Sequence, residues 1–476
     1  MQMRIGGKGA ESTGGRWIEV RNPADGTVVD RVPAGTADDV AHAVEAAGGV
    51  AQDWAGKTMR ERGMILFRAA QLVREQHHDL ARLLTTEQGK PVREATDEVR
   101  GFANILEFYA AISGEPEGDA IHLGPIGDAM VMRVPLGICG AIIPWNMPVI
   151  IMGWKVGPAL VTGNTLVLKP ASTAPLTDLK LAEILETAGL PPGVLNVVTG
   201  SGEEAGEALV RHPEVRKISF TGDYRTGHRV REVAGGQLKQ VTLELGGSDP
   251  MIVMDDADIG KAVEGALRGR FYNAGQTCTA VKRLFVHEKI AETFQSELKA
   301  RVAALRVGNG LEKTTEMGPL NSRSQRDRII SAVGTVKEKE GGKILTGGET
   351  LAYSGSDAGN FYLPTLVSDV PPDSCLLTEE IFGPVLPVVA VPDLDTAIQE
   401  ANRSRFGLGA SVWTRDMTSA KRVYREVKAG IVWVNRHLTV PPELPFGGVA
   451  ESGIGRENGK DALREYSQAK TLLLGW

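Results

Sequence analysis

The stretch Gly137-Ile-Cys-Gly-Ala-Ile-Ile-Pro-Trp-Asn-Met-Pro148 opens a new pattern in the chain. Its apolar run, Ile138 to Ile143, ends at a proline and is followed by a helical stretch. Similar runs recur, again alternating with helical stretches, at Leu166 to Leu168, Leu195 to Val198 and Ile218 to Phe220. Short apolar runs that alternate with helices are typical of βαβ units, which build a parallel sheet. The sequence therefore predicts an α/β fold.

The regions on either side of this block carry different patterns. Before it, Thr36-Ala-Asp-Asp39 and Thr58-Met-Arg-Glu61 resemble capping boxes, which predict the starts of two amphipathic helices. After it, the pattern changes between Ser248 and Pro250, and a second α/β set follows, with strands expected at Met251 to Met254, Arg283 to His287 and Val385 to Ala390. We therefore expect a second domain.

The C-terminal segment Lys470 to Trp476 is apolar and predicts a strand. It has no obvious partner strand within the chain. An exposed strand of this kind invites edge pairing with another subunit.

Length and composition exclude several classes of protein. A chain of 476 residues exceeds the size of a single hydrophobic core, so two or three domains are expected. The net charge is only −6, and the sequence contains no block of like charge, so neither nucleic acid nor a membrane is an implied partner. No apolar stretch reaches the length of a membrane span and no signal-peptide core is present, so we expect a cytoplasmic protein. The eight histidines show no metal-ligand spacing, so no metal is expected.

Two glycine-containing turns could hold a phosphate. Gly200-Ser-Gly202-Glu-Glu-Ala-Gly206 and Phe220-Thr-Gly222-Asp223 each follow a strand and lead into a helix. The first does not have the usual GxGxxG spacing, and its two glutamates would place negative charge where a phosphate normally binds. Each segment is therefore equally consistent with a tight turn between a strand and a helix.

Three further segments carry a family resemblance: Pro144-Trp-Asn146-Met-Pro148, Leu243-Glu244-Leu-Gly-Gly247 and Asn273-Ala-Gly-Gln-Thr-Cys278. They resemble the aldehyde dehydrogenase superfamily. The resemblance continues, in the expected order, through Lys169-Pro170, Glu380-Ile-Phe382-Gly-Pro384, Pro445-Phe446-Gly-Gly448 and Ser452-Gly-Ile-Gly-Arg-Glu457. It implies a Rossmann-like cofactor-binding domain at 1–112 and 134–247, an α/β catalytic domain at 248–446, and a small β oligomerisation element at 113–133 and 465–476. A homodimer or homotetramer is then expected.

The three cysteines differ in their surroundings, and all are expected to be free thiols. An aldehyde loses hydride most easily after a nucleophile has added to its carbonyl, and a cysteine thiolate suits this role. Cys278 lies in a glycine-containing turn, whereas Cys139 and Cys375 lie in or beside apolar runs and are expected to serve packing. The resemblance therefore implies that Cys278 forms a thioester.

The same resemblance assigns the other catalytic roles. Asn146 and the Cys278 backbone N–H would stabilise the oxyanion, although an asparagine before a proline can also simply complete a turn. Glu244 would be the general base that hydrolyses the thioester, although a glutamate before two glycines can also be a solvated strand end. Its presence argues against the CoA-acylating branch, and together with Cys278 and Asn146 against an inactive scaffold. Glu457 matches a proton-relay position, or could cap the following helix.

For the cofactor, the resemblance implies NAD or NADP. Lys169 would contact the adenosine ribose, Glu380 the nicotinamide ribose, and Phe382 would pack near the nicotinamide. Ser172 stands where NAD-preferring members often carry a glutamate. The negative charge that would repel a 2′-phosphate is therefore missing, and NADP is a possible cofactor as well as NAD. Asp223 stands where many members have a serine, and the sequence offers no physical reason for a carboxylate there. The remaining expected cofactor contacts are Ile143, Trp145, Gly202, Gly206, Phe220, Gly222 and Leu245.

The substrate is expected to be a small aldehyde without a carboxylate. Members specific for succinic semialdehyde resemble one another in placing two arginines near the thiol, where this chain has Trp154 and Tyr272. Aromatic rings cannot replace bidentate carboxylate recognition, so the sequence predicts a neutral aliphatic or aromatic aldehyde. Arg436 and His437 remain alternative carboxylate anchors. The residues expected at the substrate are Met147, Trp154, Tyr272, Thr277, Thr279, Val440 and Phe446.

Overall fold

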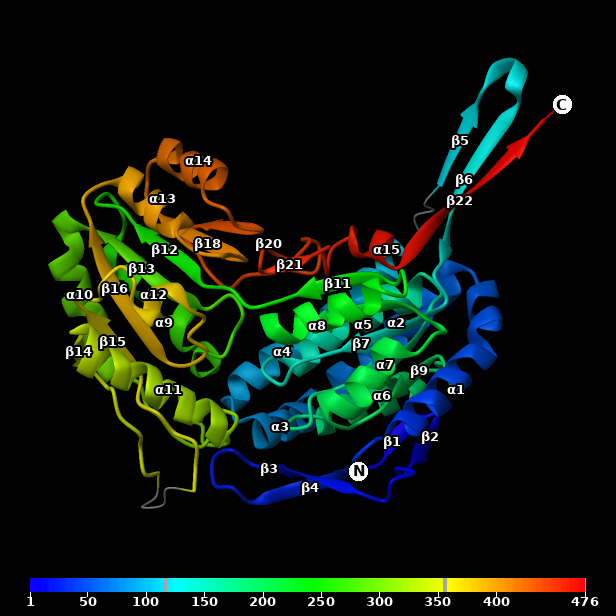
Figure 1. The fold of residues 1–476 in the computed structure, drawn as a ribbon, viewed down its shortest axis with the longest axis horizontal. Helices are drawn as coiled ribbons and strands as arrows, with labels where there is room; N and C mark the ends of the chain where they lie inside the picture. Colours follow the sequence, from blue (N-terminus) through cyan, green and yellow to red (C-terminus); the bar gives the residue numbers. More distant parts are fainter. Residues whose placement is uncertain (115–117, 354–357, 476) are drawn as a thin grey trace.

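The first half of the chain folds around a largely parallel sheet with helices on both faces (Figure 1). The structure is a computed structural model that describes residues 1–114, 118–353 and 358–475. The sheet has eight strands, in the order β2 (Lys8–Ala10), β1 (Met3–Ile5), β9 (Leu195–Val197), β8 (Thr165–Lys169), β7 (Ile138–Ile142), β10 (Val215–Thr221), β11 (Gln240–Glu244) and β21 (Gly453–Ile454). The five strands from β9 to β11 are parallel, as the apolar runs predict.

Both faces of this sheet are buried, which explains why its strands are continuous apolar runs. Leu166 and Leu168 of β8 pack into one hydrophobic core, whereas Val167 between them packs into another. The first core is covered by α2 (Met59–Glu75), α3 (His77–Gln88), α4 (Val92–Ile112), α5 (Pro148–Val161) and α6 (Leu176–Thr187). The second is covered by α1 (Ala37–Gly56), α7 (Glu207–Arg211) and α8 (Tyr224–Gly235).

The predicted helix starts are confirmed. Thr36 caps α1 and Thr58 caps α2, and in both caps the side chain accepts from the N3 backbone while the N3 carboxylate accepts from the cap backbone. The predicted strands are also confirmed, with ends within three residues of those observed.

A second α/β unit follows the change of pattern at Ser248. Its seven strands lie in the order β14 (Lys343–Thr346), β15 (Thr365–Ser368), β16 (Val385–Val391), β13 (Val281–His287), β12 (Asp249–Val253), β18 (Gly409–Trp413) and β19 (Ile431–Val434). One face packs against α9 (Ile259–Phe271), α10 (Glu288–Ala303), α11 (Arg323–Thr335) and α12 (Cys375–Thr378). The other face packs against α13 (Leu394–Asn402) and α14 (Met417–Glu426). Short elements complete the chain: β3 (Trp17–Arg21), β4 (Val28–Pro33), β17 (Phe406–Gly407), β20 (Val449–Ala450) and α15 (Ala462–Glu465).

A three-stranded arm projects from the body (Figure 1). It consists of β22 (Ser467–Leu474), β6 (Asp128–Pro135) and β5 (Gly118–His122), in that order. The expectation that the C-terminal strand has no partner within the chain is wrong, because β22 pairs with β6 along its whole length, from Ser467 opposite Pro135 to Leu474 opposite Asp128. The two strands are more than 300 residues apart in the sequence, so no local pattern reveals the pairing. Trp476 lies outside the described residues.

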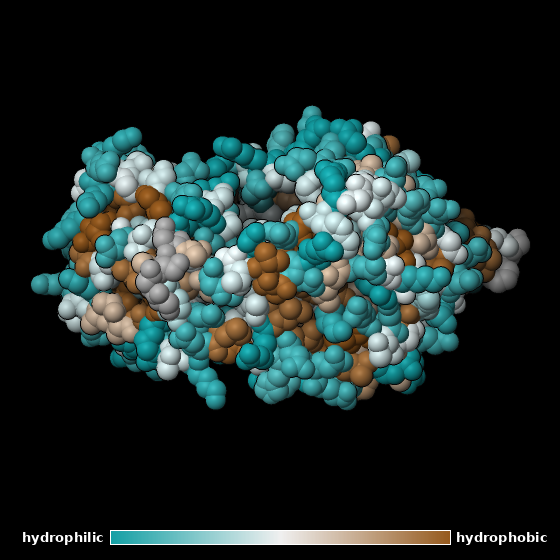
Figure 2. All heavy atoms as spheres, turned by 90° about the horizontal axis from the view of Figure 1, so that it is seen from below, coloured by the Kyte–Doolittle hydropathy of each residue, from teal (hydrophilic) through white to brown (hydrophobic). Residues whose placement is uncertain are grey.

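One face of the molecule is mostly polar. Figure 2 shows one face on which hydrophilic side chains prevail and apolar side chains form separate patches. Among the described helices, none is long and apolar enough to cross a membrane.

Candidate active site

The carboxyl ends of the parallel strands form one row across the first sheet. Ile142 at the end of β7 lies opposite Lys169 of β8 on one side and Phe220 of β10 on the other. Thr221 of β10 lies opposite Glu244 of β11. Ligands of open α/β sheets bind outside this edge, so the sequence-predicted residues Lys169, Phe220 and Glu244 share one candidate binding edge.

At one end of the row, Lys169 and Ser172 converge on a single carbonyl. Lys169 Nζ donates to the oxygens of Pro170, at 2.6 Å, and Gly200, at 3.1 Å, and Ser172 Oγ donates to the same Gly200 oxygen at 2.9 Å. Burial lowers the pKa of Lys169 to about 8. An ammonium has three N–H donors, and these two bonds leave one for a ligand. Gly206 lies beside the Lys169 side chain, because a Cβ on this glycine would be in ordinary van der Waals contact with it, at 3.5 Å.

The two glycine-containing turns have different structures. Residues Gly202–Gly206 form a single π-helical turn, whose start is capped by Ser201 Oγ accepting from Glu204 N at 3.0 Å. In the second turn, a Cβ on Gly222 would lie 2.5 Å from the ring of Phe220, so no larger residue fits. Asp223 caps α8 by accepting from Thr226 N at 3.1 Å. The carboxylate at this position therefore acts as the N-cap of α8, a role that a serine would fill equally well.

The other end of the row lies beside Glu380 and two aromatic rings. A Cβ on Gly246 would lie 1.9 Å from Glu380 Oε2, and Gly247 N donates to Glu380 Oε1 at 3.1 Å. Gly246 therefore makes room for this carboxylate, and Gly247 supplies a backbone donor to it. The rings of Trp145 and Phe382 meet edge to face, with centroids 5.6 Å apart. One end of the row thus presents the Glu380 carboxylate and two aromatic rings. The other end presents the buried ammonium of Lys169, which has one donor to spare. These two sets of groups fit the two halves of a dinucleotide.

The loop that bears Cys278 is held in a strained conformation. Asn273 and Ala274 have positive φ angles of 51° and 53°, which non-glycine residues adopt at a cost of about 1–2 kcal/mol each. Helix α4 supports this loop, because Asn273 N donates to Glu94 Oε2 at 2.8 Å. Gln88 Nε2 donates to Asn273 Oδ1 at 3.1 Å. The strain is therefore held in place by buried hydrogen bonds.

Asn146 is tied to the same loop. Its Nδ2 donates to Gln276 O at 3.0 Å, and its own carbonyl accepts from Asn273 Nδ2 and from the buried ammonium of Lys90, each at 2.8 Å. One N–H of the Asn146 amide and the backbone N–H of Cys278 make no hydrogen bond among the described residues. Two donors beside the thiol thus remain free for a ligand.

Glu244 faces the thiol from the end of β11. It is 1% exposed, and among the described residues its Oε1 has no hydrogen-bond partner. Burial raises the pKa of Glu244 well above its ordinary value, the charge of Glu457 raises it further, and Lys155 and Cys278 lower it. Burial also raises the pKa of Cys278, as does the nearby Glu244, whereas Lys282 lowers it.

A buried ion pair lies behind Glu244. Lys155 of α5 pairs with Glu457, and its ammonium also donates to Ser219 Oγ at 3.0 Å and Thr221 Oγ1 at 2.8 Å. Ser219 Oγ donates to Glu457 Oε1 at 3.0 Å. The predicted residue Glu457 is therefore part of a polar network on the same face of the sheet as Glu244.

An apolar cavity of about 210 Å³ opens onto Cys278. All seven residues predicted at the substrate line it: Met147, Trp154, Tyr272, Thr277, Thr279, Val440 and Phe446. The rings of Trp154 and Phe446 lie 4.8 Å apart. The cavity therefore combines a thiol at one wall with three aromatic side chains around it.

A sequence profile of the aldehyde dehydrogenase family matches residues 10–472. The chain belongs to this family.

The aldehyde dehydrogenase is similar to proteins of known name over almost its entire length. It is 42% identical over 476 residues to the betaine aldehyde dehydrogenase of Rhizobium etli, covering 99% of this chain and 96% of the relative. Among solved structures, an NADP-dependent enzyme of E. coli has a TM-score of 0.97 at 38% identity, covering 100% of this chain and 98% of the other. PnpE of Pseudomonas sp. WBC-3, in complex with nicotinamide adenine dinucleotide, has a TM-score of 0.98 at 37% identity, covering 100% of this chain and 97% of the other. The protein is therefore an NAD(P)-dependent enzyme that oxidises an aldehyde.

Some cavity residues of this aldehyde dehydrogenase were missed by sequence reasoning. Ile150 and Ile151 line the cavity with Met147 and Trp154, and their i, i+3, i+4, i+7 spacing on α5 could have indicated this. Arg268 precedes Tyr272 by one turn of α9 and could have been found in the same way. The remaining lining residues, for which no sequence signal exists, are Asp97, Glu98 and Leu438.

The two alternative carboxylate anchors do not reach the cavity. Arg436 is exposed, and His437 is buried between Ser411 and Thr279, with its Nε2 donating to Thr279 O at 2.7 Å. Neither is among the described residues that line the cavity. The arginine at the cavity is Arg268 instead.

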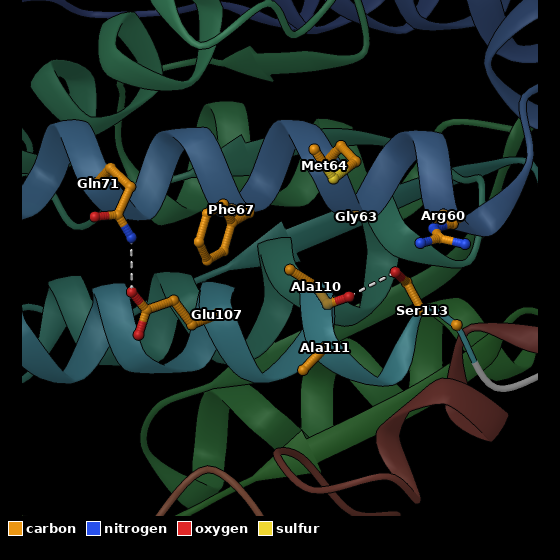
Figure 3. Close-up of a pocket in the computed structure, with 10 residues that line it drawn as sticks. Arg60, Gly63, Met64, Phe67, Gln71, Glu107, Ala110, Ala111 and Ser113 are labelled. Carbon is orange, nitrogen blue, oxygen red and sulfur yellow. Dashed lines mark hydrogen bonds between the residues drawn. The ribbon is translucent and has the colours of Figure 1, made fainter.

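A larger cavity of about 770 Å³ lies between α2 and α4 of this aldehyde dehydrogenase (Figure 3). Met64 and Phe67 project into it from α2, and Gln71 Nε2 donates to Glu107 Oε1 across it at 3.0 Å. Its described lining contains no cysteine, histidine or lysine. The smaller cavity at Cys278 is therefore the candidate active site. No group of three or more metal-ligating side chains is placed to hold a metal ion in the described parts of the chain.

Proposed function

We propose that the enzyme oxidises its aldehyde through a covalent thioester on Cys278, which is then hydrolysed by water. One observation carries the proposal: the Cys278 thiol, the Glu244 carboxyl with its unpaired Oε1 and two unused N–H donors meet beside one apolar cavity. A scaffold protein has no need for this combination.

In the first half-reaction, the Cys278 thiolate adds to the aldehyde carbon. The Asn146 amide and the Cys278 backbone N–H stabilise the resulting oxyanion, and one such donor contributes about 3–4 kcal/mol in related acyl chemistry. When bound at the edge that Lys169 and Glu380 mark, NAD(P)+ would supply the acceptor for the hydride that must leave as the thioester forms.

In the second half-reaction, Glu244 takes a proton from a water molecule that attacks the thioester. Because its pKa is raised, it is a stronger base than an ordinary carboxylate. Lys155 and Glu457 lie next to it and would pass the proton on. Hydrolysis needs this base, so Glu244 favours the hydrolytic branch over the alternative CoA-acylating branch.

For the cofactor, Lys169 would hold the adenosine ribose, Glu380 the nicotinamide ribose, and Trp145 and Phe382 would flank the nicotinamide. The neutral Ser172 leaves room for either NAD or NADP. The remaining predicted contacts, which stay proposals, are Ile143, Gly202, Gly206, Phe220, Gly222, Asp223 and Leu245.

For the substrate, we propose an aldehyde with a quaternary ammonium group, such as betaine aldehyde. The relatives named for betaine aldehyde support this choice, and so do the rings of Trp154, Tyr272 and Phe446, because aromatic faces attract such cations. At the same cavity, the carboxylate of Asp97 would attract the ammonium group of this substrate, whereas the guanidinium of Arg268 would repel it. The neutral aldehyde predicted from the sequence is the second candidate.

The domain bounds, the oligomer and the location also remain proposals. The cofactor-binding domain would comprise 1–112 and 134–247, the catalytic domain 248–446, and the oligomerisation element 113–133 and 465–476. The arm exposes apolar side chains, which supports a role in a homodimer or homotetramer; they are Ile121, Met130, Met132, Leu472, Leu473 and Leu474. A cytoplasmic location stays a prediction that cell fractionation would test.

The direct test of the nucleophile is Cys278→Ala. This variant should bind cofactor but reduce none of it, whereas Cys139→Ala, at a buried position of β7, should keep turnover. Steady turnover by Cys278→Ala would show that the thiol is not the nucleophile.

A further inference from the structure

A buried lysine lies directly behind the thiol loop. Lys282, the second residue of β13, has a fully buried side chain. Its ammonium donates to Cys278 O at 2.6 Å and to Thr277 O at 3.1 Å. The third N–H faces Glu380 Oε1, 3.2 Å away. The ammonium is therefore held by two carbonyls of the thiol loop and forms an ion pair with Glu380.

Glu380 connects this buried lysine with the cofactor edge. Its side chain is 20% exposed, whereas that of Lys282 is completely buried. Its carboxylate lies where a Cβ on Gly246 would stand, directly after the strand that ends at Glu244. A carboxylate in this position can bond either to the lysine behind it or to hydroxyl groups of a ligand in front of it.

We propose that Lys282 is a positioning residue that couples occupation of the cofactor edge to the reactivity of Cys278 through Glu380. The inference rests on the proposed roles of Cys278 and Glu380. With the edge free of cofactor, Glu380 partly neutralises Lys282. When ribose hydroxyls engage Glu380, the ammonium acts more strongly on the thiol loop.

The charges around the thiol support this coupling. Glu244, Asp249 and Glu380 each raise the pKa of Cys278, and Lys282 lowers it. Lys282 is therefore the cation that opposes three carboxyl groups.

Besides Glu94, whose carboxylate accepts from Asn273 N and whose pKa burial raises to about 7, a second titratable group packed against the loop is His437. Burial lowers its pKa to about 4, so it is neutral over the range in which a thiol titrates. Asp249 is fully buried, and burial raises its pKa to about 7. Lys282 and Glu380 form the ion pair that connects the thiol loop with the cofactor edge.

The test measures the rate at which iodoacetamide alkylates Cys278 between about pH 6 and pH 10, where a thiol in a protein can titrate. The apparent pKa from this profile does not depend on how accessible the thiol is. Lys282→Met should raise this pKa by about one unit, which makes alkylation about tenfold slower at pH 7. Glu380→Gln should shift it in the opposite direction. Because the two variants should shift the pKa of Cys278 in opposite directions, a charge effect can be distinguished from a general distortion of the site.

Two matched controls are available in the chain. Lys239 also donates its ammonium to two backbone carbonyls, those of Val210 and His212, but it lies five residues before Glu244 along the strand, about 16 Å away. Glu379 is the neighbour of Glu380 and pairs with Arg405 at the surface. Lys239→Met and Glu379→Gln should leave the profile unchanged.

A further experiment repeats the pH profile with NADH bound. NADH is chosen because its nicotinamide ring is uncharged and cannot itself act on the thiolate. Saturating NADH should lower the apparent pKa of Cys278 in the wild type but leave it unchanged in Lys282→Met and in Glu380→Gln. Equal profiles for Lys282→Met and the wild type would overturn the proposal, as would shifts of the same sign in the two variants. If Lys282→Met does not fold, the sign for Glu380→Gln decides alone. These readouts concern the thiol and not turnover, so they fail independently of the proposed reaction.

Discussion

Replacing Trp154 by leucine separates charge recognition from size recognition in the substrate cavity. The Trp154 ring is 6% exposed and stacks 4.8 Å from Phe446, so a cation beside it is largely desolvated. Cation–π attraction contributes about 1–2 kcal/mol in such surroundings. Betaine aldehyde and 3,3-dimethylbutanal have the same shape and differ in that one carries a quaternary nitrogen and the other a carbon.

The loss of apolar contact is common to both aldehydes and cancels in their ratio. Trp154→Leu should therefore lower kcat/KM for betaine aldehyde by about 5- to 30-fold more than for 3,3-dimethylbutanal. Trp154→Phe keeps a ring face and should change the ratio by less than about threefold. The assay follows cofactor reduction with both aldehydes, and thermal unfolding shows that each variant is folded.

An unchanged ratio in Trp154→Leu would refute the reasoning, because the cavity would then recognise size alone. A wild-type enzyme that prefers 3,3-dimethylbutanal would favour the neutral substrate predicted from the sequence.

Two other predictions concern the cofactor and the arm. Ser172→Glu should shift the ratio of kcat/KM toward NAD+ over NADP+ by at least about tenfold through repulsion of the 2′-phosphate, and steady-state constants that do not move would remove Ser172 from cofactor selection. Leu473→Asp should weaken self-association measured by light scattering by about 30-fold, since burial of one leucine contributes about 2 kcal/mol, whereas Leu238→Asp, at a side chain that is 95% exposed, should not.

Much of the fold follows from local patterns. The capping residues Thr36 and Thr58 and the continuous apolar strands are signals that the surrounding sequence carries by itself, and the structure agrees with them. The partner of β22 could not be predicted, because it is set by a pairing of distant segments.

The candidate site shows the same division. Cys278, Asn146 and Glu244 lie in short motifs. Asn146 and Glu244 stand at the ends of strands that share an edge of the first sheet, whereas Cys278 precedes β13 of the second sheet, so its approach to them depends on packing between distant segments. The buried supports Lys90 and Lys282 carry no motif, because a lysine is usually solvated and only three-dimensional contacts reveal these two as buried.

The central claim, a thioester on Cys278 that Glu244 hydrolyses, is tested most directly by a rapid-mixing experiment on Glu244→Gln. With saturating aldehyde and cofactor, this variant should form about one equivalent of reduced cofactor per site and then stall. Mass spectrometry of the quenched protein should show the acyl group on the peptide that contains Cys278. Sustained turnover at the wild-type rate, or an acyl group on any other residue, would contradict the account.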